Sequence, residues 1–268
     1  AYSGVPGAYS ESAVVGFFGE ECERVNYKTF EEVFLAVADG KARYGVVPVE
    51  NSSSGSINDV YDLLGKYACH IVGEQLVRVE HCLLGVPGAT LETVRTVISH
   101  PQALAQSSVF VQQHGFKTST WGNTADAARH VAELNDPSVA AIASAETAGL
   151  YGLQILSAGI NADGDNTTRF IVIERAAAAP AMTGEGQRLA LLFTARHKPG
   201  QLAVVLDQIG ARGFNMECIK SRPLPHVPFD YYFYVELVGD PAAEKTAALL
   251  RELNHVCRTV RLLGVYNK

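Results

Sequence analysis

Strong charge of one sign and a cysteine framework are both missing from this chain of 268 residues. Charged residues make up only 19%, and the net charge of −6 leaves no basic excess, which argues against a nucleic-acid partner. The cysteines are odd in number and scattered singly, so neither a disulfide framework nor a Cys-x-x-Cys metal site is indicated. They are Cys22, Cys69, Cys82, Cys218 and Cys257. This pattern fits a reduced, intracellular compartment.

A long apolar run and a signal peptide are missing as well. No run reaches membrane-spanning length, so we expect no membrane partner. The sequence opens directly on a strand-like pair, Ala1-Tyr2, which is compatible with removal of N-terminal residues. We expect a cytoplasmic protein, or a protein of the plastid stroma if the source is a plant or alga, where a transit peptide would have been removed.

The signatures of phosphate, metal and covalent chemistry are also absent. The segment 4–7 (GVPG) lacks the third glycine of a dinucleotide fingerprint, and the sequence has no Gly-Lys-Ser/Thr loop. The eight histidines are dispersed without the spacing of a zinc site, and no nucleophile elbow occurs. His100, before a proline in a turn, is interpreted as hydrogen-bonded scaffold rather than as a base. We therefore expect no cofactor and no metal.

The sequence has a high apolar content of 47%. Over residues 1–175 the apolar positions predict strands that alternate with helices. The run 44–49 has the pattern of a strand buried on both faces, and alternation with helices predicts a parallel, doubly wound α/β sheet. Thr29 and Glu32 form a capping box, and Ser10 and Thr124 are predicted to cap two further helices. Other predicted strands cover 71–79, 82–86, 94–98, 116–120, 139–143 and 171–173.

The pattern changes after residue 175. Residues 176–187 are of low complexity and are predicted to be a linker. Residues 188–268 then give the order strand, helix, strand, strand, helix, strand, which is the βαββαβ arrangement of a ferredoxin-like domain. The predicted elements are 189–194, 202–209, 216–219, 231–238, 243–253 and 260–265.

Three polar segments stand next to predicted strands: 50–56, 99–106 and 166–170. The first two lie between a buried strand and a helix N-terminus, where open α/β sheets bind ligands. The third places an amide, two hydroxyls and a guanidinium side by side, groups that can hold a carboxylate and donate to a leaving oxygen. The residues alone predict a site for a small organic acid, with or without turnover. Helix caps and an ordinary polar strand start are the alternative.

Four stretches resemble the signatures of prephenate dehydratases and the related plant arogenate dehydratases. They are 4–13 (GVPGAYSESA), 45–52 (GVVPVENS) with Gly55-Ser56 and the following 61–64 (YDLL), 99–106 (SHPQALAQ) and 166–170 (NTTRF). They occur in the family's order, and residues 188–268 resemble the ACT regulatory domain that follows in that family. The resemblance covers nearly the whole chain.

The resemblance implies an α/β catalytic part at 1–175, with two lobes similar to a type 2 periplasmic binding protein, followed by a ferredoxin-like ACT domain. The implied substrate is prephenate, which loses its ring carboxylate as carbon dioxide and its 4-hydroxyl as water to give phenylpyruvate in L-phenylalanine biosynthesis. No cofactor or metal is implied, and a homodimer or homotetramer is expected because ACT domains commonly pair. The alternatives are an arogenate dehydratase and a non-catalytic amino-acid sensor that uses the same cleft.

The resemblance also carries site residues. Thr168 corresponds to the family's important threonine and is implied to donate a hydrogen bond or proton to the leaving oxygen. Arg169 is expected to clamp a carboxylate or to brace its loop, and Glu50 to act as a relay carboxylate or a hinge partner. The remaining candidates are Asn51, Ser99 and Gln106 for positioning at the catalytic centre, and Ser52, Gln102, Thr124, Thr167 and Phe170 for substrate binding.

Two motifs of the ACT domain hold phenylalanine at a subunit interface in relatives, and both differ here. Residues 200–203 (GQLA) stand where a Gly-Ala-Leu-Val-like motif is expected, and residues 220–223 (KSRP) stand where Glu-Ser-Arg-Pro is expected. Lys220 thereby reverses a charge close to the expected ammonium position. L-Phenylalanine is the expected feedback effector, with Gly200, Gln201, Leu202, Ala203, Asn215, Ser221 and Arg222 as candidate contacts.

Overall fold

The computed structural model describes residues 1–268 except 163, 177–187, 197, 225–226, 240–242 and 268. The predicted linker lies almost entirely outside the described residues, and the domain boundaries at 175 and 188 stay predictions. The chain forms two compact units. One consists of Ala1–Val33, Val46–Ile57 and Gln75–Phe170, and the other of Phe34–Gly45, Asn58–Glu74 and Ile171–Lys268.

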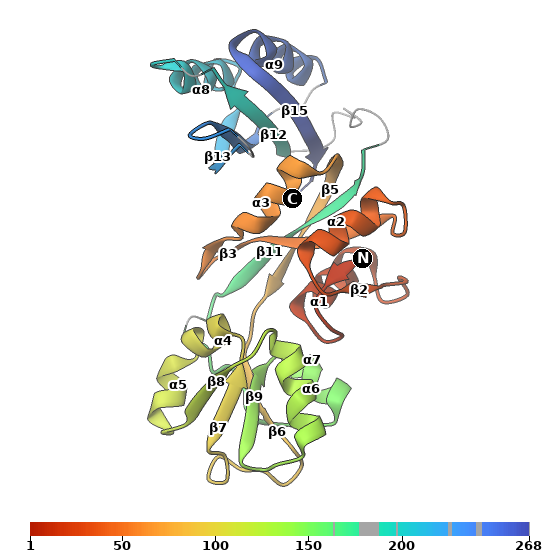
Figure 1. The fold of residues 1–268 in the computed structure, drawn as a ribbon, viewed down its shortest axis with the longest axis vertical. Helices are drawn as coiled ribbons and strands as arrows, with labels where there is room; N and C mark the ends of the chain where they lie inside the picture. Colours follow the sequence, from red (N-terminus) through yellow and green to blue (C-terminus); the bar gives the residue numbers. More distant parts are fainter. Residues whose placement is uncertain (163, 177–187, 197, 225–226, 240–242, 268) are drawn as a thin grey trace. The chain divides into compact units, whose positions relative to one another are not determined.

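Strands and helices alternate over residues 1–175, as the sequence predicts (Figure 1). The strands are β1 (Tyr2–Ser3), β2 (Asn26–Tyr27), β3 (Tyr44–Asn51), β4 (Gly55–Ser56), β5 (Cys69–Arg78), β6 (Cys82–Gly85), β7 (Thr96–Ser99), β8 (Lys117–Thr120), β9 (Val139–Ala143), β10 (Gln154–Ser157) and β11 (Thr167–Arg175). The helices are α1 (Tyr9–Phe18), α2 (Phe30–Ala38), α3 (Asn58–Lys66), α4 (Pro101–Gln106), α5 (Ser108–Gln113), α6 (Thr124–Leu134) and α7 (Ala145–Tyr151).

The first sheet has the strand order β2-β1-β3-β11-β5, with β4 paired to β3. Strand β1 runs parallel to β2 and β3, whereas β4 is antiparallel. Val46, Val47 and Val49 of β3 are at most 1% exposed, which confirms the predicted strand with two buried faces. The core therefore anchors β3 up to Asn51, its polar last residue.

The second sheet has the order β10-β6-β9-β7-β8 and is mixed rather than wholly parallel. Strand β7 runs parallel to β8 and β9, but β6 is antiparallel to both β9 and β10. The prediction of a parallel sheet was wrong for this edge, because alternation of elements along the chain does not fix strand direction. Antiparallel neighbours need no crossover helix.

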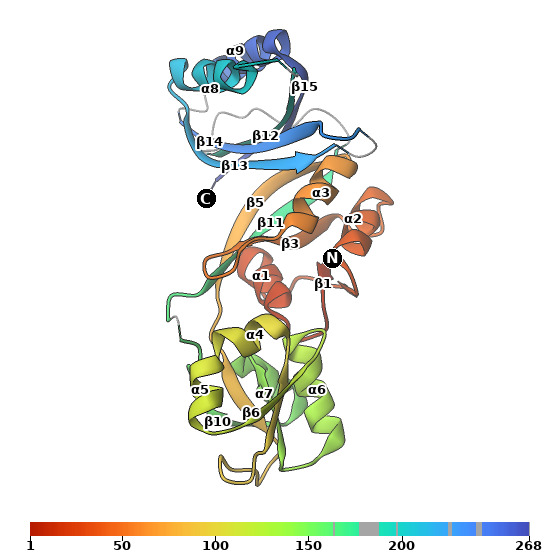
Figure 2. The same cartoon turned by 60° about the vertical axis from the view of Figure 1, so that its left-hand side comes forward.

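The C-terminal elements form the third sheet and two helices, all within the second unit. These are β12 (Arg188–Ala195), α8 (Gln201–Ala211), β13 (Asn215–Pro223), β14 (Tyr231–Val238), α9 (Ala243–Val256) and β15 (Cys257–Tyr266). The predicted βαββαβ order is confirmed, the sheet order is β13-β14-β12-β15, and α8 and α9 cover one face (Figure 2). In the same unit, β15 approaches β5 so closely that a Cβ at Gly264 would collide with the Ile71 carbonyl oxygen.

Of the three helix N-caps predicted from the sequence, the structure confirms one and contradicts two. Thr29 and Glu32 exchange both bonds of the capping box ahead of α2, as predicted. At α6 the cap is Asn123, whose Oδ1 accepts from the amides of residues 125 and 126, so Thr124 is the first helical residue instead of the cap. At α1 the cap position is Ala8, without a side-chain bond, and not Ser10.

Candidate active site

The segment 166–170 enters β11 inside the first unit, and the end of β3 lies beside it. Alternation along the strand buries Thr168 and Phe170, at 9% and 2% exposure, and leaves Thr167 and Arg169 partly exposed. Asn166, just before the strand, is fully buried. Since Asn51 is also buried, at 4%, three polar side chains meet in a place where each must find a hydrogen-bond partner.

Asn51 is the centre of this polar cluster. Its Nδ2 donates to Asn166 Oδ1 at 2.7 Å and to Thr168 Oγ1 at 2.9 Å. Its Oδ1 accepts from the backbone amides of Ser53 and Ser54 at 3.1 and 3.0 Å, which closes the turn between β3 and β4. The turn holds the Asn51 amide in one orientation, with both Nδ2 protons committed.

These contacts define what the Thr168 hydroxyl can do. Oγ1 accepts from Asn51, and among the residues that the structure describes it has no acceptor for its own proton. A hydroxyl that accepts one bond keeps its proton for another partner. Donation from Asn51 also stabilises negative charge on Oγ1, which makes the proton easier to give away. The contact with Asn51 therefore polarises the Thr168 hydroxyl.

A cavity of about 350 Å³ opens beside the cluster within the first unit. It is lined by Ser53, Ser54, Gln102, Ala105, Gln106, Asn161, Ala162 and Asn166. Two donors of these lining residues, Gln106 Nε2 and Asn166 Nδ2, are buried and have no partner among the described residues. An unpaired buried amide costs about 1–3 kcal/mol, so a pair of them is typical of a site that a ligand completes. Two neutral donors suit an oxygen-rich anion.

Gln106 is oriented by a residue that the sequence did not single out. His81 is 2% exposed, and its Nε2 lies 2.9 Å from Gln106 Oε1, while Tyr9 Oη lies 3.3 Å from its Nδ1. Burial lowers the pKa of His81 below the usual histidine value, so the ring is neutral near neutral pH. Donation from Nε2 to Oε1 fixes the Gln106 amide with its nitrogen directed away from His81. A single histidine between two strands gave no sequence signal of this role.

The other candidates near the cluster have mainly bracing contacts. Ser52 and Thr167 exchange bonds of 2.8 and 2.9 Å that join the β3–β4 turn to β11. Gln102 Nε2 donates to Ser54 Oγ at 2.6 Å and lines the cavity. Arg169 forms an ion pair with Glu50 at 3.4 Å, the bracing alternative of its two predicted roles.

Of the candidates, only Gln102 and Gln106 line the cavity, and three of the others lie outside the Asn51 cluster. Ser99 is fully buried and donates to the Ile142 carbonyl at 2.6 Å, so it stabilises the end of β7. The ring of Phe170 belongs to the core at 2% exposure, and Thr124 opens α6. His100 caps α4 by accepting from the Gln102 amide at 3.3 Å, the scaffold role that its sequence position predicts. Among the described residues no group of three or more His, Cys, Asp or Glu side chains could hold a metal ion.

The regulatory candidates fall into two groups within the second unit. Gln201 and Leu202 line a cavity of about 400 Å³ at the start of α8, where Gly200 has a φ of 74°. Ser221 and Arg222 lie on β13, and Arg222 forms two bonds to Asp62 of α3 at 2.7 and 2.6 Å. Asn215 opens β13, and Ala203 lies in α8. The residues predicted to form one effector site are therefore divided between a cavity and an ion pair.

The Asp62–Arg222 pair predicts a pH effect on stability. The bonds from Arg222 lower the folded-state pKa of Asp62 below its ordinary value of 3.8. A lowered carboxyl pKa stabilises the fold above the unfolded-state pKa, and this contribution is lost as the pH falls through the folded-state pKa. We expect Asp62→Asn to lower the free energy of unfolding by less than about 1 kcal/mol near neutral pH, because the side chain is 45% exposed. In urea titrations the gap to the native chain should close in acid; a gap independent of pH contradicts the assignment.

Comparisons with known proteins agree with the arrangement. A sequence profile of the prephenate dehydratase family matches residues 1–178. Arogenate dehydratase/prephenate dehydratase 2, chloroplastic, of Arabidopsis thaliana is 38% identical over 275 residues, covering 99% of this chain and 72% of that protein.

Two solved structures cover nearly the whole chain. A prephenate dehydratase of Arthrobacter aurescens in complex with L-Phe has a TM-score of 0.90 and 28% identity, covering 100% of this chain and 90% of that one. GqqA, described as a novel type of quorum quenching acylase, has a TM-score of 0.89 and 34% identity, covering 99% and 96%. With its polar cluster formed by the segments that carry the family's signatures, the chain belongs to the prephenate dehydratase family.

Proposed function

We propose that this enzyme converts prephenate to phenylpyruvate, carbon dioxide and water, with Thr168 as the donor to the leaving oxygen. The observation that carries the proposal is the Asn51–Thr168 hydrogen bond, which leaves the Thr168 proton uncommitted beside two unpartnered amide donors. Membership of the dehydratase family supports the reaction class.

The reaction needs little from the protein beyond binding and one donor. The bond from the ring carbon to its carboxylate breaks, and its electron pair enters the ring as carbon dioxide leaves. The bond from C4 to oxygen breaks, and the departing hydroxide takes a proton from Thr168 to become water. A proton from solvent restores the threonine. Asn51 stabilises the developing negative charge on Oγ1, and the unpaired amides of Gln106 and Asn166 hold a substrate oxygen.

Arogenate is the second substrate of the same chemistry, with an amino group in place of the side-chain ketone, and its product is phenylalanine. The test is a side-by-side measurement of kcat/KM on both substrates, following phenylpyruvate absorbance in alkali and phenylalanine by chromatography. We expect turnover of prephenate. Absence of product from either substrate, with tight binding of L-phenylalanine, would favour a sensor and overturn the proposal.

An acylase is the second candidate function, because one structural relative of 34% identity is described as a quorum quenching acylase. Amide hydrolysis by a threonine requires a base within hydrogen-bond distance of its hydroxyl. In the described structure Oγ1 of Thr168 is bonded to the Asn51 amide, which is a donor and no base. The geometry therefore favours the dehydratase, and release of an amine from an N-acylated substrate is the assay that would favour the acylase.

Asn51→Asp tests the polarising role directly. The carboxylate keeps the acceptor for the Ser53 and Ser54 amides but replaces the donor to Thr168 by an acceptor, which captures the threonine proton. We expect kcat to fall by about two to three orders of magnitude, with a small change in KM. Asn123→Asp is the matched control, because that cap uses only its Oδ1, and should have native kcat. Equal rates for both variants contradict the role of Asn51.

We further propose that the C-terminal βαββαβ part is an ACT regulatory domain and that L-phenylalanine is a feedback effector, bound beside Gln201 and Leu202. The cavity at the start of α8 and the L-Phe complex of the Arthrobacter relative support this. A homodimer or homotetramer, a two-lobed catalytic part like a type 2 periplasmic binding protein, and a cytoplasmic or plastid location complete the proposal. Among the described residues no helix is long and apolar enough to cross a membrane.

A further inference from the structure

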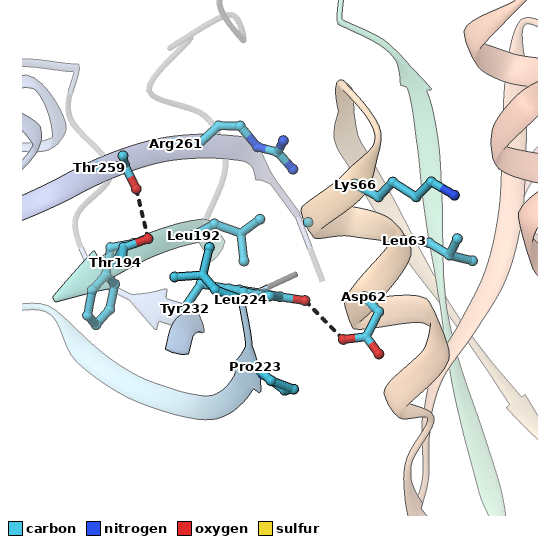
Figure 3. A pocket seen from close by; sticks show the side chains of 12 residues that line it. Asp62, Leu63, Lys66, Leu192, Thr194, Pro223, Leu224, Tyr232, Thr259 and Arg261 are labelled. Atoms are coloured by element: carbon cyan, nitrogen blue, oxygen red, sulfur yellow. Dashed lines mark hydrogen bonds between the residues drawn. The ribbon is translucent and has the colours of Figure 1, made fainter. Parts of the chain in front are cut away.

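A second cavity of the second unit lies away from the predicted effector residues 200–203. Its volume is about 670 Å³, and it lies between helix α3 and the sheet face formed by β12, β14 and β15 (Figure 3). Most of the wall is apolar: Leu192, Phe193, Pro223, Leu224 and the ring of Tyr232. A cavity of this size and lining accommodates a small molecule with an apolar body.

One cation lines this cavity without a counter-charge. Arg261 extends from β15 towards α3 (Figure 3), and its Nη2 donates to the Leu64 carbonyl. Its Nε is buried and has no hydrogen-bond partner, and no carboxylate of the described residues forms an ion pair with it. Burial lowers the pKa of the guanidinium, though an arginine stays charged near neutral pH. A partly buried cation in an apolar wall is stabilised by an anion that enters the cavity.

The one carboxylate in the wall is already engaged. Asp62 accepts two bonds from Arg222, at 2.7 and 2.6 Å, and a third from Tyr232 Oη at 3.1 Å. An ammonium group in the cavity would therefore have to displace Arg222. Figure 3 shows Lys66, the other cation at this place, extending to the opposite side of α3. The cavity thus offers an uncompensated cation to an anion, while its carboxylate is already bonded to Arg222.

We propose that this cavity binds a small arylalkyl carboxylate without an amino group, with its carboxylate on Arg261 and its ring against Leu192, Leu224 and Tyr232. The Thr194 and Thr259 hydroxyls, bonded to each other at 2.9 Å, have acceptor and donor capacity left for a second polar atom of the ligand. The site differs from the cavity at Gln201 in place and in ligand class. A bound acid would connect α3 with the C-terminal sheet and stabilise the second unit.

The test is a titration of the full-length chain with 3-phenylpropionate, measured by calorimetry and by the shift of the melting temperature. We expect saturable binding that Arg261→Gln weakens by about tenfold to a hundredfold, as for loss of a charge-assisted hydrogen bond. Arg258→Gln is the matched control, because it removes an arginine of the same strand that pairs with Asp230 and does not line the cavity. Its affinity should equal that of the native chain, and 3-phenylpropylamine, which has the opposite charge, should not bind.

A second variant distinguishes a specific loss of binding from a general loss of folding in Arg261→Gln. Thr259→Phe keeps Arg261 and adds a ring at the cavity wall, so it should also abolish this binding while circular dichroism stays native. Any weaker binding in the cavity lined by Gln106 would persist in both variants and appear as a separate phase. Equal affinity in the native chain, Arg261→Gln and Thr259→Phe overturns the proposal, and so does the absence of saturable binding. The titration measures binding at this site and does not depend on turnover. A negative result therefore leaves the dehydratase proposal unaffected.

Discussion

Replacing Thr168 by alanine is expected to lower kcat by about two to four orders of magnitude and to leave KM within a few fold of the native value. The methyl side chain removes the hydroxyl that we propose to donate to the leaving oxygen, and a donor of this kind contributes that much to catalysis. Folding should be preserved, because Thr168 is 9% exposed at the start of a strand and loses a single side-chain bond. Steady-state kinetics on prephenate, with circular dichroism as the folding check, makes the measurement.

Two controls separate donation from packing. Thr168→Ser keeps the hydroxyl and should retain most of the rate, whereas Thr168→Val keeps the shape and should be as slow as the alanine variant. Thr167→Ala, whose hydroxyl donates to the Asp165 carbonyl, should change kcat by less than about tenfold. Near-native turnover in Thr168→Val would show that the hydroxyl does not take part.

The elements around the site follow from local sequence. Tyr44–Asn51 is a strand because its apolar run is buried on both faces, and α2 begins where Thr29 and Glu32 can close a capping box. The approach of Asn51 to Thr168 has no local signal. It depends on which strands become neighbours in the first sheet and in what register, and both result from tertiary packing.

Side-chain partners explain the candidates whose expected roles changed. The sequence shows that Arg169 can bind a carboxylate, but only the fold shows that Glu50, from a distant segment, supplies one. Gln106 was a candidate because of its motif, but only the fold shows that His81 occupies its oxygen and that its buried amide nitrogen has no partner among the described residues. Neither pairing leaves a trace in residue spacing, since both join segments far apart in the chain.

Arg188, in the second unit, also has partners that residue spacing does not reveal. Its substitution has the largest effect on stability that we predict. Its guanidinium bonds to Glu74 at 2.9 Å, Glu217 at 2.6 Å and Glu236 at 3.2 Å. The arginine is 6% exposed and Glu236 is 1% exposed, while the Glu236 carboxylate also accepts from Tyr234 Oη at 2.6 Å. One cation thus compensates two buried carboxylates, Glu74 and Glu236, together with the partly exposed Glu217.

Arg188→Met should lower the free energy of unfolding by about 3–5 kcal/mol, because it removes the cation that bonds to the buried carboxylates of Glu74 and Glu236. That is a large fraction of the roughly 5–15 kcal/mol by which proteins are stable. Urea-induced unfolding, followed by circular dichroism, measures the change. Arg258→Met is the matched control: it removes a half-exposed arginine paired with Asp230, so its cost should stay below about 1 kcal/mol.

Adding Glu236→Gln to Arg188→Met distinguishes lost charge balance from lost packing. The amide removes one buried negative charge and keeps nearly the same shape, so the double variant should regain part of the stability that Arg188→Met loses. Glu236→Gln alone should destabilise the chain, since Arg188 then loses one of its carboxylates. Additive losses in the double variant would show that Arg188 acts through packing of its alkyl chain, whereas recovery shows that the buried charges depend on one another.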